Sequence, residues 1–204
     1  MIHGQSYPEI WWAEVLSEEV PEWEILPHKA QKNEVILSKR NELGLLSNFA
    51  QTPFVYHGKK YASVEGFWQM LKFPESVQDE RMNPLVTWKF NRDQVAQLVS
   101  RDAKEAGTEA SQNMKVLGID WVSFEGLQIK YYEKAKGEFY RLIRDVMVEK
   151  IKQNPEVREV LLRTGDLKLL PDHQQEVDAP PAWKYHEIWM EIRSELKRGK
   201  HAKI

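Results

Sequence analysis

The sequence predicts an α+β fold: one helix-rich domain that carries a small β-sheet. Three observations support this prediction. The chain has 204 residues, a length that suits one well-buried domain. Short runs rich in β-branched and aromatic residues gather between residues 34 and 61, whereas most of the chain beyond residue 92 follows helical periodicity. No repeat, low-complexity stretch or interdomain linker interrupts this order.

The N-terminal part is expected to begin with a helix and to continue into a first strand. Residues 9–20 show the spacing of a core-facing helix, with apolar positions at Ile10, Trp11, Val15 and Leu16. An irregular connection then covers residues 21–33, and the apolar run at 34–37 predicts a strand. We therefore expect residues 1–33 to form a helical extension of the main domain.

A hairpin and a short helix follow. Residues 53–56 and 59–61 predict two strands joined by a tight turn at His57-Gly58. Ser63 is a good N-cap for a helix over residues 64–73, since a Ser hydroxyl accepts hydrogen bonds from the first helical N–H groups. This region therefore supplies the small sheet and the first helix of the main domain.

The second half of the chain is mostly helical in its periodicity and end signals. The predicted helices cover residues 93–106 (ending at Gly107), 109–117, 138–153, 155–163, and a last helix through Tyr185, Ile188, Trp189, Ile192 and Leu196. We expect the main domain to span residues 34–198. The basic residues in 199–204 are expected to form a solvated tail.

Composition argues against several classes of function. A formal net charge of −2 provides no global positive field for tight non-specific binding of nucleic acid, and leaves only a local basic cleft open. The absence of Cys excludes disulfides, thiolate metal sites and a Cys nucleophile. We see no His and carboxylate spacing typical of a metal site, and expect no metal or other cofactor. Without a secretory signal or an apolar run of about 18 residues, we expect a cytoplasmic protein with no membrane partner.

One face of the helix predicted over residues 64–73 is polar. Glu65, Gln69 and Lys72 are spaced at i, i+4 and i+7, so they form one stripe, called the polar stripe below. Periodicity alone favours a solvated face, the usual counterpart of an apolar face. Glu65 lies in the first turn, where the helix dipole favours its ionised form. A solvated face and a functional site are therefore both open interpretations.

A longer motif around the polar stripe resembles a known family. Residues 44–73 follow the pattern of the YbiA-like or NADAR superfamily of N-glycosidases: a Gly-x-x-Ser-Asn-Phe loop, an apolar strand, a Gly-Lys turn and a Ser-x-Glu helix. The positions in register are Gly44, Ser47, Asn48, Phe49, Pro53, Gly58, Lys59, Ser63, Glu65, Gln69, Lys72 and Phe73. The family usually has His after the Glu, and this chain has Gly66. Close approach of a substrate would explain Gly66, and a packing constraint would explain it equally well.

The resemblance continues more loosely in the second half. Residues 160–169 are similar to the family's Leu-Leu-x-Thr-Gly segment, Trp183 to the Trp of its Asp-x-x-Trp-Gly element, and residues 190–193 to its Met-Glu-x-Arg helix. The glycine-rich loop that follows this Trp in the family is absent, and residues 178–186 take its place. Together with Gly66, this departure indicates a divergent subgroup.

The resemblance implies hydrolysis of the bond between C1 of a phosphorylated ribose and a nucleobase-like nitrogen, through an oxocarbenium-like transition state. Glu65 would stabilise the positive sugar and activate the attacking water. Lys72, Lys39 and Arg40 are candidate proton donors to the leaving base. The substrate-binding residues that we expect are Lys39, Arg40, Asn41, Gly44, Ser47, Asn48, Phe49, Trp68, Gln69, Lys72, Asp178 and Trp183.

Two substrate classes fit this chemistry. One is an ADP-ribosylated nucleobase, in particular guanine in single-stranded DNA or in a nucleoside, whose removal would pair this protein with an ADP-ribosyltransferase toxin. The other is a phosphoribosylamino-pyrimidine intermediate of riboflavin synthesis. Gly66 and the altered segment around Trp183 suggest a more open pocket and favour the larger, ADP-ribosylated substrate. The non-enzymatic alternative is a module that binds ADP-ribose or NAD without turnover. Glu65 argues against it, because a carboxylate gains nothing facing an anionic ligand.

Overall fold

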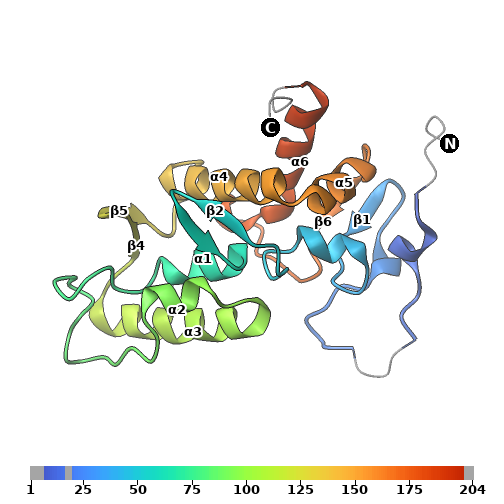
Figure 1. The fold of residues 1–204 in the computed structure, drawn as a ribbon. Coiled ribbons are helices and arrows are strands. Elements are labelled where there is room, and N and C mark those ends of the chain that lie inside the picture. Colours follow the sequence, from blue (N-terminus) through green and yellow to red (C-terminus); the bar gives the residue numbers. More distant parts are fainter. Residues whose placement is uncertain (1–6, 17–19, 200–204) are drawn as a thin grey trace. The chain divides into compact units, whose positions relative to one another are not determined.

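The computed structural model describes residues 7–16 and 20–199 (Figure 1), which form two compact units. Within the described residues, unit 1 comprises 7–16, 20–47, 155–179 and 183–199, and unit 2 comprises 48–154 and 180–182. Each unit contains helices and short strands, so the predicted α+β class is confirmed. The division at residue 33 that the sequence suggested, and the tail at 199–204, stay predictions; residues 200–204 lie outside the described residues.

Unit 1 is built around a parallel strand pair. Strand β1 (Glu34–Ile36) pairs with β6 (Lys168–Leu170), which places Val35 opposite Leu169, and both side chains are fully buried. Helix α6 packs on β6, and α5 packs on η3. The other elements of this unit are the 3-10 helices η1 (Glu9–Trp12), η2 (Pro27–Lys29) and η3 (Glu42–Leu46) and the helices α5 (Pro155–Arg163) and α6 (Tyr185–Lys197). The 3-10 helix η4 (Pro181–Trp183) lies where the chain passes between the units.

Unit 2 is built around the short helix α1 (Val64–Met70), which contacts α2, α3, α4 and β3 (Figure 1). Every residue of α1 is buried, so its apolar and polar sides both face protein. The other elements are the strands β2 (Phe54–Tyr56), β3 (Lys59–Tyr61), β4 (Trp121–Phe124) and β5 (Leu127–Lys130) and the helices α2 (Arg92–Ala96), α3 (Ser100–Leu117) and α4 (Glu138–Gln153).

The strands of unit 2 form two hairpins with the same kind of turn. His57 and Gly58 have φ of 47° and 75°, and Glu125 and Gly126 have φ of 50° and 80°. Two successive positive φ values are typical of the type I′ turn, whose twist matches that of the paired strands. The hairpin β2–β3 was predicted from His57-Gly58, whereas β4–β5 was not predicted. With β1–β6, the strands make three two-stranded sheets among the described residues.

The helix predicted over residues 9–20 is wrong. Only Glu9–Trp12 form a 3-10 helix, and Ala13 is already extended, with φ −60° and ψ 140°. Trp11 is fully buried, but Ile10 is 53% and Leu16 is 88% exposed, so a longer helix would have no apolar face to bury. Residues 17–19 of this prediction lie outside the described residues.

The helix predicted over residues 93–106 is also wrong in its limits. Helix α2 ends at Ala96, and α3 begins at Ser100 and continues through Gly107 to Leu117. Gly107 is therefore not a helix end, and Gly118, with φ 68°, ends the helix as expected. The helices predicted over residues 138–153 and 155–163, and the last helix, are confirmed.

Candidate active site

Hydrogen bonds to the turn after α2 and to the Ser-Asn-Phe loop fix the N-terminus of α1. The Ser63 hydroxyl accepts from Gly66 N at 2.9 Å and donates to Leu98 O at 2.9 Å. The predicted N-cap is thus confirmed, and it also joins α1 to the turn after α2. Glu65 N donates to Asn48 O at 2.9 Å, so the Ser-Asn-Phe loop is held directly against the first turn of the helix.

The polar stripe of α1 is buried, so the solvated-face interpretation is wrong. Glu65, Gln69 and Lys72 expose only 6%, 3% and 5% of their surface. Gln69 Nε2 donates to Glu65 Oε1 at 2.7 Å, and Lys72 Nζ donates to Gly107 O at 3.2 Å. Charged side chains are seldom buried without pairing or a function, because desolvation of each charge costs several kcal/mol.

Burial gives Lys72 an unusual acidity. The pKa of Lys72 is lowered to about 8, chiefly by desolvation and also by the Lys104 charge, while Glu65 opposes the shift. The ammonium also donates to Ser111 Oγ at 2.8 Å and lies 5.1 Å from the centroid of the Tyr131 ring. A group with a pKa near neutrality is suited to general acid catalysis, because it is mostly protonated at pH 7 and releases its proton readily.

Two amide oxygens of the 44–73 motif lack hydrogen-bond partners among the described residues. They are Gln69 Oε1 and Asn48 Oδ1, and both atoms are buried. The orientation of the Gln69 amide is fixed, because only its NH₂ group can donate to the Glu65 carboxylate. A buried acceptor without a partner costs about 1–3 kcal/mol, so each of these oxygens calls for an explanation, and a hydrogen bond from a ligand would supply one.

Two glycines allow close packing around α1; the sequence left packing open as an explanation for Gly66 and gave no such role to Gly107. A Cβ on Gly66 would lie 2.5 Å from Leu98 O and 3.1 Å from Val95 O, so helix packing requires this glycine. Of the two explanations left open for Gly66, packing is the correct one. A Cβ on Gly107 would lie 1.7 Å from Gln69 Oε1, so Gly107 admits the Gln69 side chain against α3.

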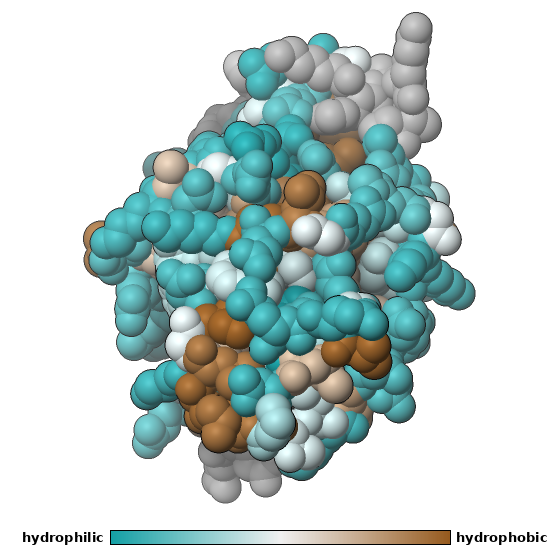
Figure 2. Space-filling model, turned by 90° about the vertical axis from the view of Figure 1, so that its left-hand side faces the viewer, coloured by the Kyte–Doolittle hydropathy of each residue, from teal (hydrophilic) through white to brown (hydrophobic). Residues whose placement is uncertain are grey.

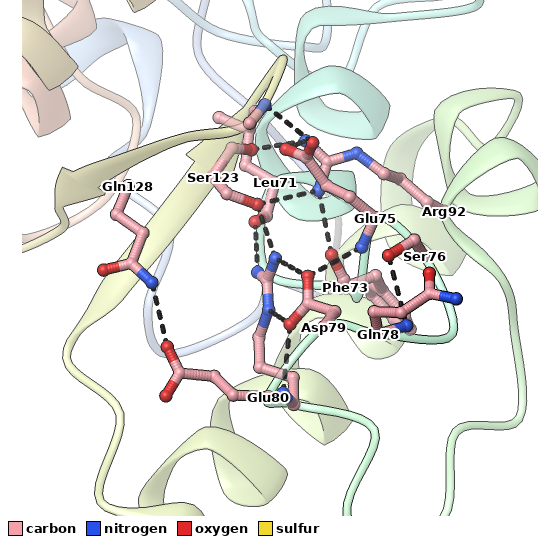
Figure 3. A network of polar contacts seen from close by, with 12 residues as sticks. Leu71, Phe73, Glu75, Ser76, Gln78, Asp79, Glu80, Arg92, Ser123 and Gln128 are labelled. Atoms are coloured by element: carbon pink, nitrogen blue, oxygen red, sulfur yellow. Dashed lines mark hydrogen bonds and ion pairs between the residues drawn. The ribbon is translucent and has the colours of Figure 1, made fainter.

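A network of arginines fixes the C-terminal end of α1 (Figure 3). Arg81 is fully buried; it donates to Leu71 O at 2.9 Å, to Asp79 and to the Ser123 hydroxyl, and its guanidinium lies 4.7 Å from the Trp121 ring centroid. Arg92 donates to Phe73 O at 2.8 Å and to Ser123 O. These carbonyl groups belong to the residues on each side of Lys72, so the network fixes the backbone from which the Lys72 side chain extends.

The remaining predicted residues of unit 2 are Phe49 and Trp68. Phe49 is partly buried in the loop after Asn48. Trp68 is 6% exposed, donates its indole N–H to Tyr131 OH at 3.0 Å and packs edge-on to Phe139 with centroids 5.0 Å apart. Trp68 is therefore packed in the core of unit 2, which leaves none of its faces open for stacking on a base.

Predicted residues in unit 1 have partners of their own. Lys39 forms an ion pair with the buried Asp172, and Arg40 forms a bidentate pair with Glu24 at 2.7 and 2.6 Å. Both cations are therefore already neutralised, which leaves Lys72 as the candidate proton donor in the unit that holds Glu65. Asn41 caps η3 by accepting a hydrogen bond from Leu43 N, and Gly44 packs against the Lys39 backbone. Ser47 is buried after η3. Trp183 is partly buried in η4, and Asp178 is exposed.

The sequence missed four residues around the polar stripe: Lys104, Gly107, Ser111 and Tyr131. The first three share one face of α3, at i, i+3 and i+7, a signal that was present in the sequence. Tyr131 follows the unpredicted hairpin β4–β5, and no pattern in the sequence pointed to it. Within residues 7–16 and 20–199, no three His, Asp or Glu side chains gather as a metal site, and no helix is long and apolar enough to span a bilayer.

Fold and site together define an α+β protein in which the helix α1 and the turn after it carry a buried carboxylate, amide and ammonium. No family model and no curated protein matches the chain. Among solved structures, the chain is similar to the NMR structure of the E. coli protein YbiA, with 20% sequence identity, coverage of 84% of this chain and 90% of that chain, and a TM-score of 0.49. The motif at residues 44–73 and the geometry of unit 2 therefore remain the basis for assigning a function.

Proposed function

We propose that this protein is an N-glycosidase that hydrolyses the bond between ribose C1 and a nucleobase nitrogen, with Glu65 as its catalytic carboxylate. The observation that carries the proposal is the composition of the polar stripe. A buried carboxylate, a buried ammonium with a pKa of about 8 and two unpartnered amide oxygens lie on or beside one short helix. Groups of perturbed pKa beside unpartnered polar atoms are typical of functional sites.

Each group has a role in the proposed reaction. The C1–N bond breaks with its electron pair leaving on the nitrogen, and Lys72 donates a proton to that nitrogen. Glu65 stabilises the positive charge on the sugar and accepts a proton from the water that attacks C1. Gln69 Oε1 and Asn48 Oδ1 accept hydrogen bonds from the hydroxyl or N–H groups of the substrate.

The substrate that we propose is ADP-ribose attached to guanine, in single-stranded DNA or as a nucleoside. The 178–186 segment supports this choice, since it replaces the glycine-rich loop of the riboflavin-type members of the family and favours a more open pocket for a larger substrate. Gly66 no longer supports it, because packing against carbonyl oxygens of the α2–α3 turn accounts for this glycine.

The test compares substrates under identical conditions. We expect the protein to release free ADP-ribose from ADP-ribosylated guanosine and from an ADP-ribosylated single-stranded oligonucleotide, which leaves unmodified guanosine and unmodified oligonucleotide, as measured by chromatography with mass detection. Faster turnover of the phosphoribosylamino-pyrimidine would contradict the assignment of an ADP-ribosylated substrate but would still be consistent with the proposed N-glycosidase reaction. No turnover of any of these compounds, together with tight binding of ADP-ribose, would replace the proposal with a binding module.

A further inference from the structure

Unit 2 contains a cavity of about 890 Å³ that the proposed reaction does not use. Met70 contributes to its wall from α1, but Glu65, Gln69 and Lys72 do not line it. Its volume lies within the range typical of ligand sites, about 300–1,000 Å³. The cavity is therefore a candidate binding site separate from the polar stripe.

Aromatic rings from two parts of unit 2 line this cavity. Tyr61 and Phe124 come from the two hairpins and are held in place by Phe67, with ring centroids 4.9 and 5.5 Å away. Trp88 comes from the long segment between α1 and α2 and packs on Phe73 at 5.1 Å. Phe90, two residues further, is 36% exposed and so has ring surface available to a ligand. Fixed aromatic rings are what base stacking requires.

Some charged side chains along the rim of the cavity form ion pairs, and others do not. Glu75 is paired with Arg92 at 3.2 Å and Glu125 with His57 at 2.9 Å, while Lys89 is paired with Glu109 at 3.0 Å. Lys59 and Lys60 are exposed on β3, and neither forms an ion pair among the described residues. Asp93 is the remaining exposed acid in the lining. The rim thus offers unpaired ammonium groups, which suit a phosphate backbone.

The long segment at residues 74–91 forms a second wall and has no helix or strand. Segments of this length without secondary structure are uncommon in compact units and are usually functional. The buried Arg81 holds it in place by its bonds to Leu71 O and Asp79. Exposed apolar side chains of the segment include Val77 and Met82, which are 78% and 50% exposed. Figure 2 shows apolar surface on the lower part of the face turned toward the viewer.

From these features we propose that the cavity binds single-stranded nucleic acid. Bases stack on Phe90 and on neighbouring rings, and the phosphates of the strand contact Lys59 and Lys60. The cavity is larger than one base requires, and it continues onto the exposed apolar residues Val77 and Met82. A strand therefore fits it better than a free nucleotide, which shares the same chemistry. This binding is independent of hydrolysis at Glu65.

The test measures binding of a fluorescein-labelled dT oligonucleotide by anisotropy, with AMP as the free-nucleotide arm. We expect saturable binding of the oligonucleotide and much weaker binding of AMP. Phe90→Ala should weaken oligonucleotide binding by about 5- to 150-fold, the usual range for loss of one stacking ring. Lys59→Gln with Lys60→Gln should reduce the slope of log K against log salt by about 1.4, as two lost phosphate contacts require.

Matched controls lie on the same unit but outside the cavity lining. Leu127→Ala removes another exposed apolar side chain, and Lys115→Gln with Lys130→Gln removes two exposed cations. These variants should bind the oligonucleotide as the wild type does. Equal losses in the controls, wild-type binding by the Phe90 and Lys59/Lys60 variants, or no saturable binding of the oligonucleotide would overturn the proposal. Tighter binding of AMP than of the oligonucleotide would replace the strand with a free nucleotide. None of these results depends on whether the protein is a glycosidase.

Discussion

At the scale of single residues, Gly66 is required by backbone packing, whereas Gly107 is required by the position of the Gln69 side chain. An added methyl group at Gly66 would meet carbonyl oxygens of the backbone, which cannot move without disturbing the turn after α2. At Gly107 it would meet the end of the Gln69 side chain, which can rotate away. The same substitution is therefore expected to affect stability at one position and the polar stripe at the other.

We expect Gly66→Ala to lower the free energy of unfolding by about 1–3 kcal/mol, the usual cost of overpacking. Gly107→Ala should cost less in stability, since Ala favours helix, yet it should reduce turnover by displacing Gln69 from Glu65. Urea unfolding and a hydrolysis assay on both variants check this pair. Full activity of Gly107→Ala, or wild-type stability of Gly66→Ala, would contradict the role given to that glycine.

Lys72 makes a prediction about pH. Its pKa is about 8 in the folded protein and about 10.5 when unfolded, so between these values the unfolded state binds more protons. The free energy of unfolding must therefore rise with pH across this window, and the cost of burying the charge is fully present below it. We expect the stability of the wild type relative to Lys72→Met to increase by about 2 kcal/mol from pH 7 to pH 9.5.

Urea unfolding at both pH values measures this difference, and Lys115→Met, at an exposed lysine of α3, should show no such change. A flat or falling difference for Lys72→Met would show that this lysine is not buried as charged.

At the scale of elements, the C-terminal end of α1 depends on Arg81 more than on its own sequence. Only seven residues of α1 are helical, too few for a helix to be stable alone. The buried Arg81 donates to Leu71 O, which also accepts from Ser123 N at 3.1 Å, and it donates to the Ser123 hydroxyl of β4 (Figure 3). The helix that carries the polar stripe is thus held by tertiary contacts.

We expect Arg81→Met to lower the free energy of unfolding by about 3–5 kcal/mol, because it leaves Asp79 without its buried partner. The matched control is Gln128→Ala, which removes the exposed hydrogen bond to Glu80 in the same region (Figure 3) and should change stability by less than about 0.5 kcal/mol. Chemical unfolding measures both. Similar effects of the two substitutions would mean that Arg81 does not hold α1.

At the scale of the whole molecule, the sequence predicted the α+β class, the caps and most helices, because these depend on local signals. Ser63, Gly118 and Pro155 set element ends through their own backbone chemistry, and such signals are readable in one dimension. What the sequence could not show was burial. The polar stripe has the spacing of a solvated face, and only the packing of α3 against α1 turns it inward.

The predicted site shows the same division. Glu65, Gln69 and Lys72 were found because the motif places them on one helix, and Asn48 because it belongs to the same motif. Tyr131 comes from a distant part of the chain, and its position beside Lys72 follows from the β4–β5 hairpin. Arg40 was predicted as a phosphate ligand, but its bidentate pair with Glu24 depends on a contact between loops that leaves no periodic signal.

Catalysis is assigned to the Glu65 carboxylate, and Glu65→Gln removes the charge on which this role depends. Gln keeps the shape of the side chain and can still accept from Gln69 Nε2, but it carries no charge. We expect turnover of ADP-ribosylated guanosine to fall by about 10²- to 10⁴-fold, with substrate affinity and Tm close to those of the wild type. Glu105→Gln, at an exposed position of α3, should retain full activity. Wild-type turnover by Glu65→Gln would contradict the proposed mechanism.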